Sequence, residues 1–443
     1  MSQPKVAPST DVRFGVAAWA VWDFGAIGLN AIVATFVFPV YLTSTVGVSL
    51  HGGTTPASWL GRTAAIAGVL IAVLAPAVGV WVESPHRRRV ALAVLTGMAV
   101  VLTSSMYLIR AQPSYLWAGL ALLAATAACS DLASVPYNAM LRQLSTSQTA
   151  GRISGIGSAA GYSGSVMLLL LLYLGFISGK GEEHGLLHLP THDGLNVRTA
   201  MLVTGAWLAL FGLPLLLIAH RLPDSGEVSH PTSMLGGYRK LWTEVRAEWQ
   251  RDRNLVNFLA ASALFRDAMA ALFAFGAVLG VNVYGISQAN VLIFGVAACV
   301  VAAVGAVLGG IVDYRIGSKP VIVGSLVVIL SMVLALLLLS GSLAFWVGGL
   351  VLCTFIGPAQ SSSRALVLHM ANQGKEGVAF GLYTMTGRAV AFVAPWLFSV
   401  FVDVFGAVRA GLGGIALVLT AGVLGMLAVR VPPRRWAVQL EQA

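Results

Sequence analysis

Long apolar segments separated by short polar stretches recur along the whole chain. A helix needs about 20 predominantly apolar residues to cross the hydrocarbon core of a bilayer. Segments of this length are found at Val16–Leu42, Trp59–Val82, Val90–Ile109, Tyr115–Met140, Ile153–Ile177, Thr199–His220, Leu255–Tyr284, Gln288–Val312, Pro320–Leu339, Leu343–Met370, Val378–Phe401 and Ala410–Val431. The pattern therefore predicts an all-α membrane protein with twelve transmembrane helices.

One longer polar stretch, residues 221–254, divides these spans six plus six. It predicts two six-helix bundles, residues 1–220 and 255–443, joined by a linker. Within the linker, residues 238–253 mix charged and apolar side chains at helical spacing. This spacing suits an amphipathic helix lying on the membrane surface, or equally a plain linker helix between the halves.

The composition agrees with lipid as the main solvent. Of the 443 residues, 57% are hydrophobic and only 10% are charged, whereas soluble domains carry about 25% charged residues. The net charge is +10, from 27 Lys and Arg against 17 Asp and Glu. Because these basic residues lie in short loops and no polar domain is visible, they indicate orientation in the membrane rather than binding of nucleic acid.

The basic residues are distributed asymmetrically between the two sides of the predicted membrane. With both termini in the cytoplasm, 19 of them lie on the cytoplasmic side and 5 on the external side. The external ones are Arg62, Arg110, Lys180, Arg198 and Arg409. This asymmetry predicts cytoplasmic N and C termini, and the short loops suit the plasma (inner) membrane of a bacterium.

Two turns that follow the second and eighth spans repeat one pattern, 230 residues apart. Each has a glycine, an acidic residue four positions later and then basic residues. The residues are Gly79, Glu83, Arg87 and Arg88 in the first copy, and Gly309, Asp313, Arg315 and Lys319 in the second. The glycine allows two helices to approach closely, and the acid can bind a basic side chain or a helix N-terminus of the other bundle. We predict a cytoplasmic gate here; the alternative is a static salt bridge in each loop.

Ionisable and polar side chains also lie within the spans. A charge at the centre of a span costs about 2.5–3.5 kcal/mol on insertion scales, so such residues are usually paired or line a wet cavity. Repeated halves place the binding site of a transporter between them. The predicted substrate and coupling cavity consists of Asp23, Asn30, Asp131, Tyr137, Asn138, Arg266, Asp267, Gln360 and Arg364. Arg388 is predicted to be structural.

The doubled glycine–acid–basic turn resembles the signature loop of the major facilitator superfamily. Further stretches are similar to the autophagy-linked vacuolar effluxer family and its bacterial relatives. These stretches are residues 19–24, 137–141, 151–155, 161–162, 357–364 and 380–383. The resemblance implies a twelve-helix transporter whose cavity is lined by spans 1, 4, 7 and 10, and it suggests export of amino acids. A more distant resemblance is to the cation-coupled glycoside symporters.

Two interpretations of the intramembrane charges remain open. In one, Arg364 or Arg266 binds a substrate carboxylate, since arginine suits bidentate binding of anions, and an acid carries a coupling proton. The candidate acids are Asp23, Asp131 and Asp267. In the other interpretation, the charges form permanent pairs between helices or act as gates.

The sequence favours a secondary active transporter of a small polar solute over an enzyme or a receptor. It contains no P-loop pattern and no constellation of nucleophile and base, and no extra-membrane sensing domain. His184, His188 and His192 are four residues apart, but Gly185 and Pro190 favour a solvated loop over a metal site. We expect a monomer with no cofactor or metal, a small-molecule substrate, and a proton or sodium as coupling ion. Sugar symport and lipid or drug export are the alternatives.

Overall fold

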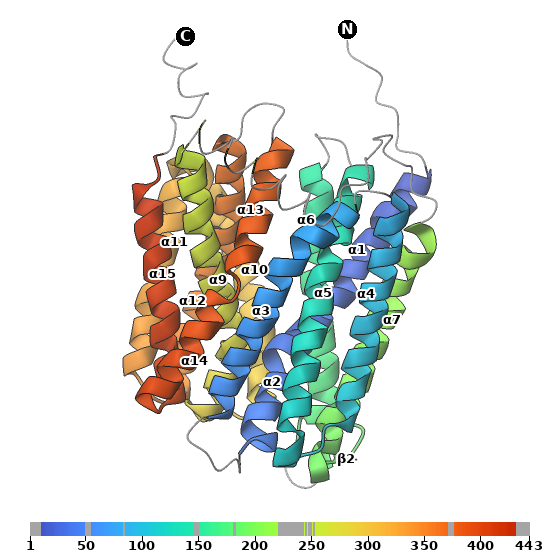
Figure 1. Cartoon of the computed structure of the whole chain (residues 1–443). Helices are drawn as coiled ribbons and strands as arrows, with labels where there is room; N and C mark the ends of the chain where they lie inside the picture. The colour runs from blue at the N-terminus through green and yellow to red at the C-terminus, as the bar shows by residue number, and fades with distance from the viewer. Residues whose placement is uncertain are drawn as a thin grey trace, which may run out of the picture.

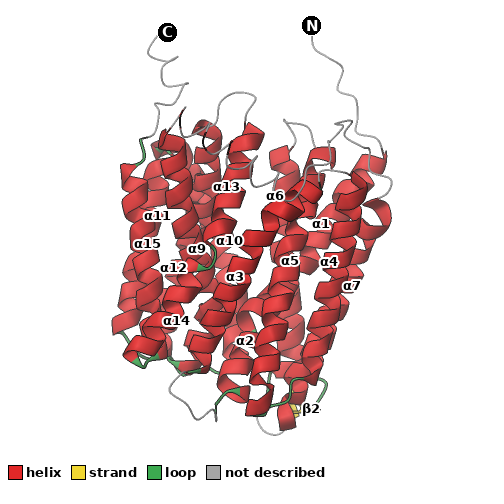
Figure 2. Cartoon of the chain, in the orientation of Figure 1, coloured by secondary structure: helices red, strands yellow, loops and turns green. Residues whose placement is uncertain are grey.

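The computed structural model confirms the all-helical membrane architecture. It describes residues 10–48, 55–82, 85–144, 150–179, 183–219, 253–370 and 376–430, and the single positions 243, 246 and 250. Within these residues, 12 stretches are long and apolar enough to cross a bilayer, as the sequence predicts. Nearly all of the ribbon is helical (Figure 2). The predicted linker at 221–254 and its amphipathic helix lie almost entirely outside the described residues.

The first six spans combine regular helices with short π- and 3-10-helical segments. They are α1 (Thr10–Asn30) with η1 (Ala31–Phe36), α2 (Phe38–Tyr41) and η2 (Leu42–Val46); α3 (Pro56–Trp81); α4 (Pro85–Ser105) with η3 (Met106–Leu108); η4 (Pro113–Tyr115) with α5 (Leu116–Leu144); α6 (Ala150–Leu172) with η5 (Tyr173–Ile177); and η6 (His192–Gly194) with α7 (Leu195–Ile218). The connection from η5 to η6 contains the antiparallel strands β1 (Glu183–His184) and β2 (Leu189–Pro190).

The second six spans are more regular, apart from the eleventh. They are α9 (Arg253–Asn282), α10 (Gln288–Ile316), α11 (Ser318–Leu338), α12 (Ser342–Met370), α13 (Glu376–Val390) with α14 (Val393–Phe405), and η8 (Val408–Ala410) with α15 (Gly411–Ala428). Span 11 breaks between α13 and α14, three residues before Pro395. Pro395 is the third residue of α14. A proline is tolerated in the first turn of a helix because the N–H groups of that turn have no partner within the helix.

The helices form two bundles that stand side by side, α1–α7 in one and α9–α15 in the other (Figure 1). We call them the N-bundle and the C-bundle. Helix α1 begins and α15 ends on the same side of the molecule, at the top of Figure 1; we call this the terminal face and the other side the opposite face. The bundles contact each other mainly through α3 with α13 and α14, α6 with α10, and η1 with α9.

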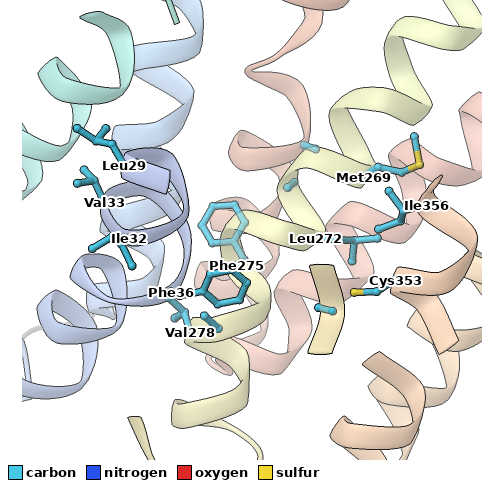
Figure 3. Close-up of a cluster of buried hydrophobic side chains, with 14 of the residues drawn as sticks. Leu29, Ile32, Val33, Phe36, Met269, Leu272, Phe275, Val278, Cys353 and Ile356 are labelled. Atoms are coloured by element: carbon cyan, nitrogen blue, oxygen red, sulfur yellow. The ribbon is translucent and has the colours of Figure 1, made fainter. Parts of the chain in front are cut away.

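An apolar layer joins the two bundles near the middle of the molecule. Phe36 of span 1 lies beside Phe275 and Val278 of α9, and Leu29 and Ile32 lie on the side of span 1 away from α9 (Figure 3). Each of these side chains is at most 4% exposed. Span 1 begins at the terminal face with Thr10. Leu29, Ile32 and Phe36 therefore lie further toward the opposite face than the first turns of this span. It therefore separates the upper part of span 1 from the opposite face.

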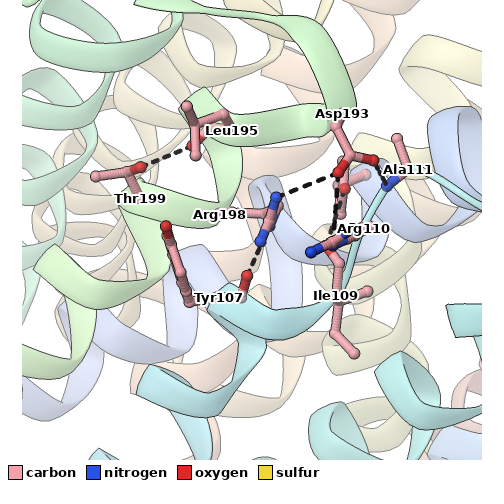
Figure 4. Close-up of polar contacts among 9 residues, drawn as sticks. Tyr107, Ile109, Arg110, Ala111, Asp193, Leu195, Arg198 and Thr199 are labelled. Carbon is pink, nitrogen blue, oxygen red and sulfur yellow. Dashed lines mark hydrogen bonds and ion pairs between the residues drawn. The ribbon is translucent and has the colours of Figure 1, made fainter.

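A charged cluster fixes the loops of the N-bundle at the opposite face (Figure 4). The Asp193 carboxylate lies 3.7 Å from Arg110 and 3.5 Å from Arg198, and it accepts a hydrogen bond of 3.2 Å from the Ala111 N–H. Arg198 also donates to the Tyr107 carbonyl oxygen at 2.6 Å. These contacts tie η6 and α7 to the end of span 3, so this face of the N-bundle is held together by its own charges.

Candidate substrate cavity

A partly open polar cavity lies on the N-bundle between α1 and α5. Its lining residues recur every three or four positions on both helices, which places them on one face of each helix. They are Trp19, Trp22, Asp23, Ala26, Ile27 and Asn30 of α1, and Ser130, Asp131, Ser134, Tyr137 and Asn138 of α5. Five residues of the predicted cavity, Asp23, Asn30, Asp131, Tyr137 and Asn138, are therefore brought together here.

An aromatic stack forms one wall of this cavity. The Tyr137 ring lies between the rings of Trp19 and Trp22, with centroid distances of 4.4 Å to each. The Trp19 Nε1–H donates to the Tyr137 carbonyl oxygen at 3.0 Å, and the Trp22 Nε1–H donates to Thr96 Oγ1 at 3.2 Å. The Tyr137 hydroxyl is buried near Asp23 and has no hydrogen-bond partner among the described residues. The two tryptophans were not predicted to line the cavity, although their helical spacing from Asp23 was the available signal.

Arg266 of the C-bundle is held by a neighbouring helix. Its guanidinium carbon lies 3.6 Å from the centroid of the Tyr383 ring. It donates hydrogen bonds to the carbonyl oxygens of Tyr383 at 2.5 Å and Ser262 at 3.3 Å. Any Cβ at Gly387 would approach this guanidinium carbon to 2.7 Å, so the glycine makes room for the arginine. Arg266 is therefore engaged in packing α9 against α13.

Arg364 of α12 is placed differently. Its side chain is exposed, and it forms no hydrogen bond or ion pair with another residue that the structure describes. It lies within electrostatic range of Arg266 and of Tyr162 on α6. Gln360, one turn earlier on the same helix, is half-buried. Of the two arginines predicted to bind an anion, Arg364 is therefore the one with a free guanidinium.

An ion pair joins the bundles at the edge of the cavity. Arg388 Nη1 of α13 lies 3.1 Å from Asp131 Oδ1 of α5. Arg388 Nη2 also donates to the Ser134 hydroxyl, one turn further along α5, at 2.7 Å. Asp131 was predicted to be a cavity residue and Arg388 a structural one; the structure brings the two side chains together.

Asp267 lies apart from the cavity lining. It is 5% exposed, and its Oδ2 accepts a hydrogen bond of 2.8 Å from the Ala394 N–H at the start of α14. A carboxylate at a helix N-terminus is favoured both by the free N–H groups and by the helix dipole. Asp267 therefore caps the second half of the broken span 11.

The predicted gate turns both lie at the terminal face, between α3 and α4 and between α10 and α11. In the first turn, Glu83 falls outside the described residues, and Gly79 belongs to the last turns of α3. Arg87 is exposed, whereas Arg88 is buried and donates to the Val82 carbonyl oxygen at 3.1 Å. Arg88 thus stabilises the end of its own turn.

In the second turn, the described contacts remain within the C-bundle. A Cβ at Gly309 would lie 2.8 Å from the Pro358 Cα, so this glycine allows α10 to pack closely on α12. Asp313 Oδ1 accepts a hydrogen bond of 2.9 Å from the Ser318 hydroxyl. Lys319 donates to the carbonyl oxygens of Leu427 and Val429 at the end of α15, at 2.9 and 2.6 Å, and Arg315 is exposed. A gating role for the two turns stays a prediction.

Twelve spans in two bundles, with a polar cavity on the face of one of them, define a secondary transporter of the major facilitator fold. Solved transporters share this fold: the chain superimposes on a D-xylose–proton symporter with a TM-score of 0.69 at 15% identity, covering 95% of this chain and 98% of that one. It superimposes on an inward-facing bacterial homologue of the human lysosomal transporter Spinster with a TM-score of 0.63 at 14% identity, covering 96% of each chain. The chain belongs to the vacuole effluxer Atg22-like family, whose model matches residues 43–436.

Two relatives illustrate the range of this family. An uncharacterized MFS-type transporter of Bacillus subtilis, YxiO, is 21% identical over 408 residues, which is 92% of each chain. Autophagy-related protein 22 of the fungus Botryotinia fuckeliana is 24% identical over 332 residues, covering 68% of this chain and 51% of the fungal protein. These similarities and the fold identify a membrane transporter of small molecules rather than an enzyme.

Proposed function

We propose that this transporter exports small zwitterionic solutes, amino acids in the first place, across the plasma membrane of a bacterium. The fungal relative bears the name of an autophagy protein and the family that of a vacuole effluxer, which supports transport of small solutes across a membrane; the outward direction is part of the proposal. The choice of a zwitterionic solute rests on the charges around the cavity.

The observation that carries the proposal is the separation of charge between the two bundles. The cavity lining on the N-bundle includes the carboxylates of Asp23 and Asp131 and no basic residue. The C-bundle contributes Arg364, whose guanidinium has no ion-pair partner among the described residues, and Arg388. A solute with an ammonium group and a carboxylate would complement both sides. Arg364 is the proposed partner of the carboxylate, because guanidinium binds carboxylates in a bidentate manner.

The contacts between the bundles support alternating access about this cavity. Arg62 of α3 forms an ion pair with Asp403 of α14, and Gln288 of α10 donates to Ser44 at 3.0 Å. Both contacts lie near the opposite face, beyond the apolar layer of span 1. We interpret this conformation as closed toward the opposite face, with the cavity accessible from the terminal face, which we propose to be cytoplasmic. Rocking of the bundles would then present the solute to the other side.

Asp23 is the proposed site of a coupling proton, with a sodium ion as the alternative coupling ion. It forms no ion pair with a described residue and lies beside the Tyr137 hydroxyl. Asp131 is already paired with Arg388, and Asp267 caps α14. Of the three acids, Asp23 is therefore the one whose carboxylate forms no described contact that joins two helices.

Counterflow in proteoliposomes tests the proposal. We expect wild-type protein to exchange labelled leucine and tyrosine but not a neutral disaccharide. Arg364→Ala should reduce the exchange at least about tenfold, because the solute carboxylate loses a charged partner. Arg409→Ala is the matched control, since Arg409 is a half-buried arginine that binds Ser340 at the opposite face and lies over the Tyr284 ring, away from the cavity lining; its exchange should equal that of wild type.

Two outcomes would contradict the proposal. Exchange of the disaccharide without exchange of amino acids would favour a sugar symporter, in which the acids bind hydroxyl groups. Absence of exchange of all three solutes under proton and sodium gradients would direct the search to lipids and drugs.

A further inference from the structure

The Asp131–Arg388 pair ties the cavity wall of one bundle to the other. Arg388 makes both of its described contacts with α5, to Asp131 at 3.1 Å and to Ser134 at 2.7 Å. The arginine side chain is 23% exposed and the aspartate side chain 46% exposed. The pair is therefore accessible from the cavity, and water or a solute can reach the carboxylate without unfolding any helix.

The surroundings make this pair sensitive to a competing cation. Arg388 and Arg364 both lie within electrostatic range of Arg266, so three guanidinium groups gather on the C-bundle. If Arg388 left Asp131 with nothing in its place, the carboxylate would remain unpaired within the membrane span, which is unfavourable. An ammonium group that replaced Arg388 would remove that penalty. The Trp19, Tyr137 and Trp22 rings line the same cavity and favour a cation as well.

We propose that Arg388 is a tethered counter-ion of Asp131. In the empty transporter its guanidinium pairs with the Asp131 carboxylate, and in the loaded transporter the ammonium group of the solute takes its place. Binding of the solute then releases α13 from α5, which links occupancy of the cavity to the freedom of the two bundles to move. Arg388 is thus a positioning residue that competes with the solute instead of binding it. The inference rests on the proposed function, because it requires a solute with an ammonium group.

Competition predicts an unusual effect of substitution, namely tighter binding. Removal of the guanidinium in Arg388→Gln should lower the Kd for leucine about three- to fivefold, the gain expected when a partly exposed ion pair no longer has to be broken. Arg388→Lys keeps the ion pair and should bind leucine as wild type does. Ser134→Ala removes only the second contact and should tighten binding slightly.

The experiment is isothermal titration of the full-length protein in detergent with two probes, leucine and its decarboxylated analogue 3-methylbutylamine. Arg388→Gln should bind both probes more tightly, and Arg409→Gln, the matched control, should bind as wild type does. Asp131→Asn should lose affinity for both, and adding Arg388→Gln to it should then change nothing. Equal melting temperatures and monodisperse elution verify that each variant is folded. In counterflow, Arg388→Gln should lower both the KM for leucine and the maximal rate. Simple loss of structure would lower the maximal rate without lowering the KM.

The two probes separate the failure of the inference from the failure of the proposed function. Leucine binding that is unchanged or weaker in Arg388→Gln would overturn the counter-ion role and leave amino-acid transport standing. Tighter binding of the amine, with no binding of leucine to any variant, would overturn amino-acid transport and keep the counter-ion role. Binding of neither probe would overturn both.

Discussion

Each charge within the membrane has surroundings of its own. Asp267 and Arg266 are satisfied inside the C-bundle, by a helix N-terminus and by the face of an aromatic ring. Asp131 is paired across the two bundles. Asp23 and Arg364 form no ion pair with a described residue. An intramembrane charge without a counter-charge is costly, so these last two are the side chains for which a transported solute or ion offers the largest gain.

The cap on α14 gives a prediction for Asp267. Asp267→Ala should lower the melting temperature in detergent, because the buried Ala394 N–H loses its acceptor. The expected loss is about 0.5–2 kcal/mol, typical of a removed N-terminal cap. Asp267→Asn retains an acceptor oxygen and should melt close to wild type and transport at a similar rate. Differential scanning fluorimetry and counterflow are the measurements.

Glu183→Gln serves as the control for this experiment, since the Glu183 carboxylate is exposed and its described partner is the exposed His188. It should leave the melting temperature unchanged. A stable Asp267→Asn variant without gradient-driven transport would contradict a purely structural role and return Asp267 to the coupling residues.

At the scale of elements, α3 is the main contact between the bundles, and its glycines explain how closely it approaches span 11. A Cβ at Gly61 would lie 3.0 Å from the Pro395 carbonyl oxygen, and one at Gly68 would lie 3.0 Å from that of Ala391. The α3 helix thus runs along the break between α13 and α14, and the ion pair of Arg62 with Asp403 closes its end at the opposite face. Arg62 also lies over the Trp59 ring, 4.7 Å from its centroid.

This arrangement predicts that the Arg62–Asp403 pair holds the opposite face closed. In a background without the three buried cysteines, Ile27→Cys provides a reporter in the cavity. With the proposed orientation, Arg62→Ala should raise the rate at which an impermeant maleimide labels this reporter from outside whole cells. The expected increase is about two- to fivefold, because a partly exposed pair contributes up to about 1 kcal/mol. The exchanged pair, Arg62→Asp with Asp403→Arg, should restore slow labelling.

Arg110→Ala is the control for the labelling experiment. Arg110 lies on the same face, but its partner Asp193 belongs to the same bundle, so its loss should not alter access to the cavity. If Arg110→Ala and Arg62→Ala speed labelling equally, the effect is a general loosening of that face, and the pair is no lock.

The elements were predictable from the sequence where the bilayer sets them. Twelve spans follow from hydropathy because hydrocarbon thickness fixes their length, and Asp23 and Asp131 were assigned to the cavity because charges are rare in spans. The partners of the side chains were not predictable. Asp23 and Asp267 are similar in sequence, since each follows a large side chain within its span. Only the packing of the helices shows that Asp23 lines the cavity and that Asp267 caps α14. Arg62 and Arg388 were treated as an orientation signal and a structural residue because their partners lie far away in the chain.

For the molecule as a whole, the position of the basic residues bears on the orientation. Four of the five residues predicted to be external lie on the opposite face of the described structure: Arg62, Arg110, Arg198 and Arg409. Three of them are engaged there in ion pairs. The gate turns, with Arg87 and Arg315, lie at the terminal face. If basic loops remain in the cytoplasm, the terminal face is cytoplasmic.

Reporter fusions decide this orientation. Green fluorescent protein fused after Ala443 should fluoresce, and alkaline phosphatase at the same position should be inactive, because the former folds in the cytoplasm and the latter requires an oxidising compartment. Insertion of the same reporters at Lys180, in the connection between η5 and β1, should give an active phosphatase and no fluorescence. This insertion also serves as the control for expression of both reporters. An active phosphatase at Ala443 would show the opposite orientation in the membrane. The cavity would then be accessible from outside in this conformation, and the Arg62–Asp403 pair would close the cytoplasmic side. The proposed direction of export would lose its structural support.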